Sequence, residues 1–485
     1  MTKVKPFIKL FQTPGGHYVY DVNTNAIIKI RKSLYDFLMS EQKSKMDVKE
    51  CFITSEDKEL LEKMRNIGFF SSKKVREISH IEDHVLEYHL DNKLKMIVLQ
   101  VTQNCNLRCH YCAYSGNYLN RKHTDIRMDF DTARKGIDFL IRNSRDVNNI
   151  RVGFYGGEPL LEFGLVKKCI DYTIEATEGK TVNFNLTSNG TLFTKEIIEF
   201  FMQHDVEITI SLDGPKEIHD KNRKFVVSGC GTFDKVSKNL EFFKENYPEY
   251  FKKVMFNTVL DNKNDFNCVN EFFASYDIIK NSFVTSNEIS PIYAKVKSEL
   301  CEEYEIKKSY EQFKIFLNKV NRLDECYVSK LLKSDYDRLK QNMSKERKHT
   351  KELPDKSHHG GPCVPGTHRL FMDVNGNFYP CEKASEDSDI MRIGHVDRGF
   401  DIEKVRALLN IGRLTKEKCI DCWAFRFCIM CAVFADDKIR LSAEKKQSNC
   451  NAVRNMQEAN LKDYCTFIEF GHDFRENDIY FEMEE

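Results

Sequence analysis

Residues 101–116 read VTQNCNLRCHYCAYSG, a stretch that places Cys105, Cys109 and Cys112 directly after an apolar run. The Cys-x3-Cys-x2-Cys spacing presents three thiolates to one small inorganic group. Three ligands on a four-iron cluster leave one iron open, which favours a site for chemistry over a purely structural one. The sequence therefore indicates an iron–sulfur cluster with a free coordination position.

The other cysteines are concentrated in the last third of the chain. Disulfide frameworks are typical of small secreted chains, whereas the start MTKVKPFIKLF is charged and has no apolar secretory segment. We therefore expect a cytoplasmic protein with reduced thiols, in which Cys-x2-Cys pairs indicate metal or cluster ligands. The clustered cysteines are Cys363, Cys381, Cys419, Cys422, Cys428, Cys431 and Cys450.

Length and composition limit the class of protein. The chain has 485 residues, 41% of them hydrophobic, and its 74 basic residues balance 74 acidic ones. This length accommodates about two to four domains with a substantial core. A net charge near zero gives no electrostatic footprint for nucleic acid, and no apolar run approaches the roughly 18 residues of a membrane span. We therefore expect a small or peptidic partner, and neither nucleic acid nor a membrane.

The first 75 residues are expected to form a unit of their own. KPFIKLFQTP and HYVYDVNTNAIIKI are typical of strands around a turn at Gly15 and Gly16, and SLYDFLMSEQ and SEDKELLEKMRNIGFF are typical of helices. Small strands followed by helices predict a winged-helix-like module. Two interpretations stay open: a cap on the core, or a peptide-recognition element whose exposed strand edge accepts an extended segment.

Strands and helices alternate from about residue 95 to 290. The expected strands are MIVLQVT, IRVGFYGG, VNFNLTSNG, VEITISLDG and KVMFNTVL, with a weaker run at 282–289. Such alternation predicts an α/β parallel sheet with outer helices, closed or partly closed into a barrel. Chemistry in these barrels lies at the carboxyl ends of the strands. The cysteine triplet and residues 156–159, 188–190 and 211–214 follow four successive strands, so we expect them at one mouth.

The motifs CNLRCHYC, FYGGEPLL, LTSNG, SLDGP and NTVL, in this order and spacing, resemble the radical S-adenosylmethionine (SAM) superfamily. The resemblance covers most of residues 95–290 and implies a partial (β/α)6 TIM-type barrel. It also implies a 4Fe–4S cluster on Cys105, Cys109 and Cys112, with SAM chelating the open iron. An electron from this cluster would cleave SAM to a 5′-deoxyadenosyl radical, which can take hydrogen from an unactivated carbon.

Side-chain chemistry and the resemblance together indicate which residues contact SAM. The two glycines of the GGEP turn would let the backbone approach the amino group of SAM, and Glu158 would accept from it. Tyr111 would pack near adenine, and Ser188 and Asn189 would bind the ribose or the carboxylate. Arg223 would pair with that carboxylate, or is a surface arginine. The full expected set is Tyr111, Gly156, Gly157, Glu158, Ser188, Asn189, Ser211, Asp213, Arg223 and Asn257.

The C-terminal cysteine pattern is similar to the SPASM extension of radical enzymes that modify peptides and proteins, which binds two auxiliary 4Fe–4S clusters. By position, one cluster would use Cys363, Cys381 and Cys431. The other would use four residues, Cys419, Cys422, Cys428 and Cys450.

This chain departs from the SPASM pattern in two ways. Cys428 and Cys431 enclose two residues where three are common, and the first auxiliary cluster has no obvious fourth ligand. Distant candidates for that ligand are Cys326, His358 and His359; otherwise an open iron could bind a substrate thiolate. A zinc ribbon is the alternative for this region, because Cys-x2-Cys pairs also suit tetrahedral zinc.

Together the modules resemble maturases of ribosomally made peptides, in particular the thioether-forming sactipeptide and ranthipeptide synthases. The resemblance implies a Cys-containing precursor peptide with a leader, and an electron donor such as a ferredoxin or flavodoxin. Glu382, next to Cys381, is the candidate general base; the alternatives are a glutamate that supports a cluster ligand without binding the cluster, or a surface glutamate. Alternatives are a peptide epimerase, a carbon–carbon crosslinking enzyme, an anaerobic sulfatase-maturing enzyme and, outside enzymes, a zinc-binding winged-helix regulator.

Five segments are expected along the chain. They are the recognition element (1–75), the radical SAM barrel (92–290), a helical bridge (291–360), the SPASM domain (361–455) and a C-terminal tail (456–485).

Overall fold

The computed structural model describes residues 5–42, 53–296, 299–345, 347–361 and 363–474. Part of the first 75 residues and the end of the expected tail, 475–485, therefore lie outside the described residues. No helix within the described ranges is both long and apolar enough to cross a membrane.

A three-stranded antiparallel sheet forms the N-terminal unit. Its strands β1 (Ile8–Thr13), β2 (Gly16–Asp21) and β3 (Ala26–Ile30) pair in that order, and α1 (Lys32–Gln42) and α2 (Ser55–Asn66) follow. Alternate residues face opposite sides. Val19 and Ile28 pack with the two helices, whereas Tyr18 and Tyr20 pack in a second cluster with Leu461. Both faces of this small sheet are therefore buried.

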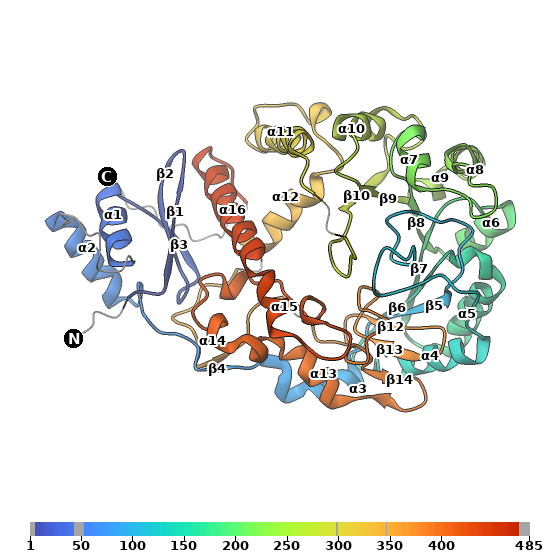
Figure 1. Cartoon of the computed structure of the whole chain (residues 1–485), viewed down its shortest axis with the longest axis horizontal. Coiled ribbons are helices and arrows are strands. Elements are labelled where there is room, and N and C mark those ends of the chain that lie inside the picture. Colours follow the sequence, from blue (N-terminus) through green and yellow to red (C-terminus); the bar gives the residue numbers. More distant parts are fainter. Residues whose placement is uncertain (1–4, 43–52, 297–298, 346, 362, 475–485) are drawn as a thin grey trace.

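The second cluster includes the C-terminal helix. Helix α16 (Cys450–Glu469) lies alongside the N-terminal sheet (Figure 1). Its Tyr464 and Phe467 are buried in this second cluster. Tyr18 donates to the Glu469 carboxylate at 2.6 Å. The boundary expected at residue 456 falls inside this helix, so the segment that follows is not a separate tail up to Glu469. The reason is the apolar face of α16, which buries side chains against the N-terminal sheet.

Six parallel strands form the central sheet, and all six predicted strands are confirmed. The order β10-β9-β8-β7-β6-β5 follows the chain, as expected when each strand is joined to the next by a helix. The strands are β5 (Met96–Thr102), β6 (Asn149–Gly156), β7 (Thr181–Ser188), β8 (Glu207–Ser211), β9 (Met255–Leu260) and β10 (Phe283–Glu288). Among the described residues β10 ends the ladder, so hydrogen bonding does not close the strands into a ring.

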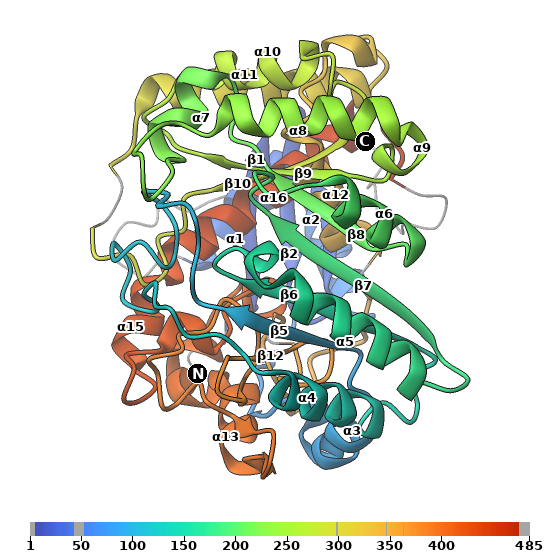
Figure 2. The same ribbon diagram turned by 90° about the vertical axis from the view of Figure 1, so that its right-hand side faces the viewer.

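Helices cover one face of these strands (Figure 2). Helix α4 shows why they form: Asp129 caps its first turn by accepting from Thr132 N, and Ala133, Ile137 and Leu140 form its buried face. The helices in and before this domain are α3 (Leu86–Asn92), α4 (Phe130–Arg142), α5 (Phe163–Ala176), α6 (Lys195–Gln203), α7 (Lys216–Asn222), α8 (Phe233–Asn246), α9 (Pro248–Phe251) and α10 (Phe266–Ser275).

The cysteine-rich region continues the same sheet. Strand β12 (Leu370–Met372) pairs in parallel with β5, with Phe371 opposite Val98, and β13 (Asn377–Tyr379), β14 (Gly394–His395) and β15 (Gly399–Phe400) follow in antiparallel order. This region therefore shares a hydrogen-bonded ladder with β5, the strand that precedes the cysteine triplet. The other elements are β4 (Glu77–Ile78), β11 (Lys356–Ser357), α11 (Glu302–Lys319), α12 (Lys333–Lys340), α13 (Ile402–Leu409), α14 (Lys416–Cys419) and α15 (Ala443–Ser448).

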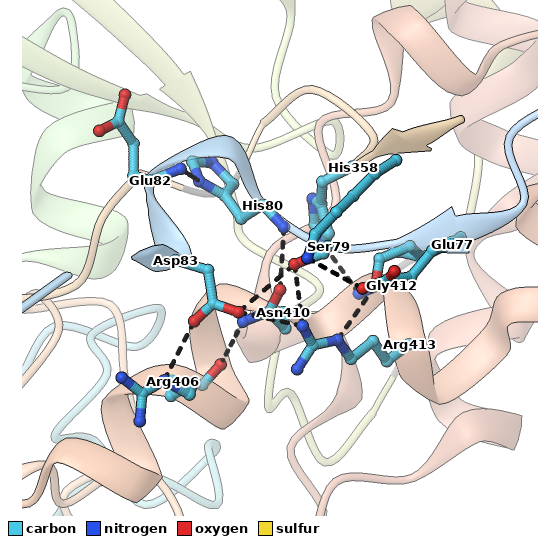
Figure 3. Close-up of polar contacts among 12 residues, drawn as sticks. Glu77, Ser79, His80, Glu82, Asp83, His358, Arg406, Asn410, Gly412 and Arg413 are labelled. Atoms are coloured by element: carbon cyan, nitrogen blue, oxygen red, sulfur yellow. Dashed lines mark hydrogen bonds and ion pairs between the residues drawn. The ribbon is translucent and has the colours of Figure 1, made fainter. Parts of the chain in front are cut away.

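A polar network joins the segment before the barrel to the cysteine-rich region (Figure 3). The Asp83 carboxylate accepts from Arg406 at 3.1 Å and from Arg413 at 3.0 Å. Arg413 also donates to the carbonyl of Ile78 at 3.0 Å, and His80 N donates to Asn410 Oδ1 at 2.9 Å. These bonds hold the two regions in one relative position.

Candidate active site

The cysteine triplet lies on the loop that follows β5. Cys105 and Cys109 are buried, and the three thiols are close enough to interact electrostatically. Burial raises the pKa of both residues to about 12, and it also raises the pKa of Cys112. Such thiols are protonated at neutral pH unless a cation binds them, because burial disfavours the thiolate. The triplet is therefore suited to a metal group that supplies positive charge.

The two glycines of the GGEP turn bring the end of β6 against this loop. Gly157 N donates to the carbonyl of Thr102, and the next peptide N–H donates to the carbonyl of Asn104, both at 2.9 Å. A Cβ on Gly157 would lie 1.9 Å from the Asn104 oxygen, and one on Gly156, whose φ is +139°, would lie 2.0 Å from the Thr102 oxygen. The close approach that the glycines allow here is to the cysteine loop; approach to SAM stays a prediction.

Glu158 connects the ends of β6 and β7. Its buried carboxylate accepts from Leu160 N at 3.1 Å, from Ser188 Oγ at 2.9 Å and from Asn189 N at 2.7 Å. Burial raises its pKa to about 7 although these bonds favour the charged form. Asn189 in turn directs its amide toward Cys105 Sγ, at 3.9 Å. The three expected SAM contacts thus lie together beside the triplet.

Arg223 belongs to a buried cluster, so the interpretation as a surface arginine is wrong. Its Nε donates to Asp213 Oδ2 at 2.9 Å and its Nη2 donates to Asp213 Oδ1 at 3.3 Å. Tyr111 donates to the same carboxylate, and the guanidinium lies over the Tyr111 ring. The two opposite charges compensate each other in this buried pair. Pairing of Arg223 with the carboxylate of SAM stays a prediction.

Ser211, the last residue of β8, is paired in register with Asn257, the third residue of β9. Asn257 Oδ1 accepts from Thr285 at 3.2 Å and from Asn287 at 2.9 Å, both on β10. The structure therefore brings together the residues expected at the mouth of the sheet.

Three cysteines of the C-terminal region form a first thiol group. Cys363, Cys381 and Cys431 interact electrostatically, and burial raises the pKa of Cys381 to about 11. Arg369 and Glu382 lie beside Cys363, and Arg369 donates to the Glu382 carboxylate. The second carboxylate oxygen of Glu382 is buried without a hydrogen-bond partner in the described structure.

Four cysteines form a second thiol group around a cavity of 240 Å³. Burial raises the pKa of Cys428 to about 11, and Cys428 interacts electrostatically with Cys419 and Cys422. Among the described residues, no three His, Cys, Asp or Glu side chains converge closely enough to hold a single metal ion. The cavity residues include the thiols of Cys419, Cys422, Cys428 and Cys450.

The distant candidates for a fourth ligand lie elsewhere. His359 lines the cavity of the second thiol group, not the first. His358 accepts from Gly412 N at 2.9 Å and packs beside His80 (Figure 3), and Cys326 is exposed in a short 3-10 helix. His359 therefore faces the second thiol group, and the fourth ligand of the first auxiliary cluster stays a prediction.

Sequence reasoning missed a buried network between the barrel mouth and the C-terminal region. Arg121 pairs with Glu386 at 2.5 Å, and Gln100 donates to Glu386 at 2.8 Å and to the Tyr114 hydroxyl at 2.7 Å. Glu382 is near enough to act electrostatically on Arg121 and on Tyr155. Arg121 lies in an irregular stretch after the triplet, where no periodicity or motif could have identified it.

The family comparison matches this architecture. Residues 99–273 match the family described as the Radical SAM superfamily. These residues form a radical SAM domain. It comprises most of the central sheet, including the loop of the cysteine triplet, the GGEP turn and the Asp213–Arg223 pair.

Relatives of the radical SAM domain include anaerobic sulfatase-maturating enzymes. The chain is 25% identical to the cysteine-type enzyme of Clostridium perfringens over 352 residues, 69% of this chain and 87% of that enzyme. It is 31% identical to the serine-type enzyme of Bacteroides thetaiotaomicron over 160 residues, 32% of this chain and 38% of that enzyme. For the latter, as for an uncharacterised relative in Methanocaldococcus jannaschii, the chain spans less than half of the relative's length.

A solved structure shares the fold. The structure described as "Native anSMEcpe with bound AdoMet" superposes with a TM-score of 0.57 at 21% identity, over 77% of this chain and 99% of that one. The α/β radical SAM fold with its parallel sheet is therefore confirmed, and part of this chain has no counterpart in that structure.

Proposed function

We propose that this radical SAM enzyme forms intramolecular thioether crosslinks between cysteine sulfur and carbon in a ribosomally made precursor peptide. One observation carries the proposal: the Glu382 carboxylate is near enough to act electrostatically on Cys363 of the first thiol group and on Tyr155 and Arg121. A radical site, a proton acceptor and a three-thiol group that leaves a metal position open for a substrate sulfur would then adjoin one another.

The residues present fit the expected cofactors. Cys105, Cys109 and Cys112 would hold the cluster that, together with SAM, supplies abstraction of a hydrogen atom from the peptide. Their raised pKa values mean that the buried thiols need a bound cation to ionise. Two auxiliary 4Fe–4S clusters would occupy the first and second thiol groups, and a cavity of 240 Å³ at the second supports a polynuclear group over a zinc ion.

The chain's own residues have separate tasks in the proposed reaction. Each crosslink removes two hydrogen atoms from the peptide, one as a hydrogen atom and the other as a proton and an electron. Glu382 would take the proton: Arg369 donates to one of its carboxylate oxygens, and the other is buried without a hydrogen-bond partner in the described structure. Asp213 and Arg223 shape the mouth at which substrate and SAM would meet.

The peptide would dock at the N-terminal unit. Strands β1 and β3 each pair only with β2 among the described residues, and an outer edge of this sheet could accept an added strand from a leader peptide. In support of a peptide substrate, a related solved structure is described with a bound peptide, "Cp18Cys". A fluorescently labelled leader peptide should bind the full chain at least tenfold more tightly than a labelled precursor peptide from which the leader has been removed.

Mass spectrometry of a co-expressed Cys-rich precursor encoded beside this gene tests the proposal. Each crosslink should remove two hydrogens and consume one free thiol. Glu382→Gln should lower crosslinking at least about 100-fold while SAM cleavage continues, whereas Glu417→Gln, an exposed glutamate on α14, should change neither. Unchanged mass with deuterium uptake would indicate epimerisation, and hydrogen loss with intact thiols would indicate a carbon–carbon crosslink.

A sulfatase-maturing activity is the second candidate, because similarity to the Clostridium perfringens enzyme extends over 352 residues. Oxidation of a sulfatase-derived peptide, with no change in the co-expressed precursor, would favour it. Metal analysis of the purified protein distinguishes these two radical SAM activities from a zinc-binding regulator. Anaerobically purified protein should be brown with about twelve irons and sulfides per chain, and a colourless zinc protein would refute every radical mechanism.

A further inference from the structure

The cavity of the second thiol group has a one-sided charge distribution. Besides the four cysteines, the cavity is lined by the basic side chains of Lys418 and Arg454, and none of its lining residues is acidic. Arg454 interacts with the Cys422 thiol and favours its ionised form. The surroundings of this site therefore favour negative charge inside the cavity.

Lys446 is a third cation near the cavity, although it is not one of the lining residues. Its side chain is completely buried on α15, and Nζ donates to Thr415 Oγ1 at 2.7 Å. The same Nζ lies 3.7 Å from Cys419 Sγ, and its charge also acts on Cys428. In the part of the chain that the structure describes, no carboxylate lies within ion-pair distance of this ammonium.

A buried ammonium without an anionic partner is costly, because it has left water and gained no opposite charge. Four thiolates holding an iron–sulfur cluster carry a net negative charge, and reduction adds one more. Lys446 therefore stabilises the occupied site, and it stabilises the reduced form more than the oxidised form. A positive charge placed in this way raises the reduction potential of the group beside it.

The first thiol group has different surroundings. The carboxylate of Glu382 lies against Cys363 and Cys381 and opposes added negative charge. Arg369 offsets it, but is itself paired with Glu382. The first thiol group thus has a carboxylate beside it together with the cations Arg369 and Lys383, whereas only cations adjoin the second thiol group.

We propose that Lys446 makes the four-thiol site the auxiliary centre of higher reduction potential, where the electron removed from the substrate comes to rest. The inference rests on the clusters assigned in the proposed function. One electron reduces the four-thiol centre, and an oxidised ferredoxin or flavodoxin removes it again, so the balance is one electron in and one electron out. Lys446 acts through Cys419 and touches no substrate, which makes it a positioning residue.

Potentiometric titration followed by electron paramagnetic resonance tests this role without any peptide. The measurement uses the full chain, purified anaerobically, with only the four-thiol site left able to hold a cluster. That background carries Cys105→Ala, Cys109→Ala, Cys112→Ala, Cys363→Ala and Cys381→Ala.

Replacing the buried charge should lower the reduction potential. In Lys446→Met the ratio of reduced to oxidised centre at a fixed ambient potential should fall at least roughly tenfold, a shift of about 59 mV for one electron. Lys446→Arg keeps the charge and should stay within about threefold of the parent. Lys418→Met removes a charge from the exposed rim of the same cavity, and should also stay within about threefold because water screens it.

The outcomes distinguish a failure of this inference from a failure of the proposed function. Equal iron content and equal potential in Lys446→Met and the parent would overturn the role of Lys446, as would an equal shift in Lys418→Met. If Lys446→Met loses its iron while Lys446→Arg retains it, the buried charge is needed for the site itself, which supports the inference. Zinc in place of iron in the parent background would instead overturn the cluster assignment of the proposed function.

Discussion

Replacing Gly157 by alanine should remove the cluster expected on Cys105, Cys109 and Cys112, although none of these three ligands is substituted. The added Cβ would lie 1.9 Å from the carbonyl oxygen of Asn104, whereas real Cβ contacts under 3.0 Å essentially do not occur. The cysteine loop must therefore retreat by about 1 Å, because its neighbour is backbone and cannot rotate away. Cys105, the next residue after Asn104, moves with it.

The cost of Gly157→Ala follows from the same contacts. Overpacking of this kind costs about 1–3 kcal/mol, and the two hydrogen bonds between the glycine turn and the loop are each worth about 1 kcal/mol. The total, about 3–5 kcal/mol, falls on the few residues that must hold the cluster. Gly157→Ala should therefore lose this cluster under conditions in which the protein is still folded.

Iron analysis and electron paramagnetic resonance measure this effect. Gly157→Ala should lose about four of the expected twelve irons and the spectral change on adding SAM. Gly164→Ala is the matched control, because nothing lies within 4 Å of its Cβ position in α5. It should keep all iron and be as stable as the parent, or more stable by up to about 1 kcal/mol. Full iron and SAM cleavage within about twofold of the parent in Gly157→Ala would refute the steric reasoning.

Two further substitutions test the electrostatics of the fold. Asp83→Asn should cost about 1–2 kcal/mol at pH 7: burial raises the pKa of Asp83, but hydrogen bonds from two arginines more than offset this and leave it lowered. Because the pKa of Asp83 is lower in the folded protein than in the unfolded chain, the carboxylate stabilises the folded state at pH values above its unfolded pKa of about 4. The difference in the free energy of unfolding between Asp83→Asn and the parent, measured in urea, should therefore vanish as the pH falls below about 4. A difference that does not depend on pH would contradict this. Arg223→Met should cost about 3–5 kcal/mol, because it leaves the Asp213 carboxylate buried without its cation. Arg151→Met, in a half-exposed pair, should cost at most about 1 kcal/mol in the same assay, and equal losses would contradict the distinction.

Local patterns were enough to predict the central sheet. The run 96–102 is entirely buried as β5, and a continuous apolar strand is typical of a parallel sheet covered on both faces. The motifs that follow the strands converge because parallel strands end at one edge. Cys363, Cys381 and Cys431 interact electrostatically, and the other four cysteines line one cavity, but their grouping as cluster ligands stays a prediction.

Contacts between distant segments could not be predicted in this way. Arg121 pairs with Glu386 only because β12 brings the C-terminal region to the barrel mouth, and nothing local to either residue encodes that pairing. Lys446 stands in a lysine-rich run, where the sequence gives no reason to expect a buried ammonium. His359 faces the second cavity because of the path of the chain between the two thiol groups.

The pairing of β12 with β5 has a consequence for synthesis. The edge of β5 is completed by residues 370–372, which leave the ribosome long after the radical SAM domain has been made. Until then the nascent chain exposes an apolar strand edge, a ready template for pairing with another chain. Fragments that stop before residue 370 should therefore aggregate, and productive folding in the cell should depend on slow translation or on a chaperone that covers this edge.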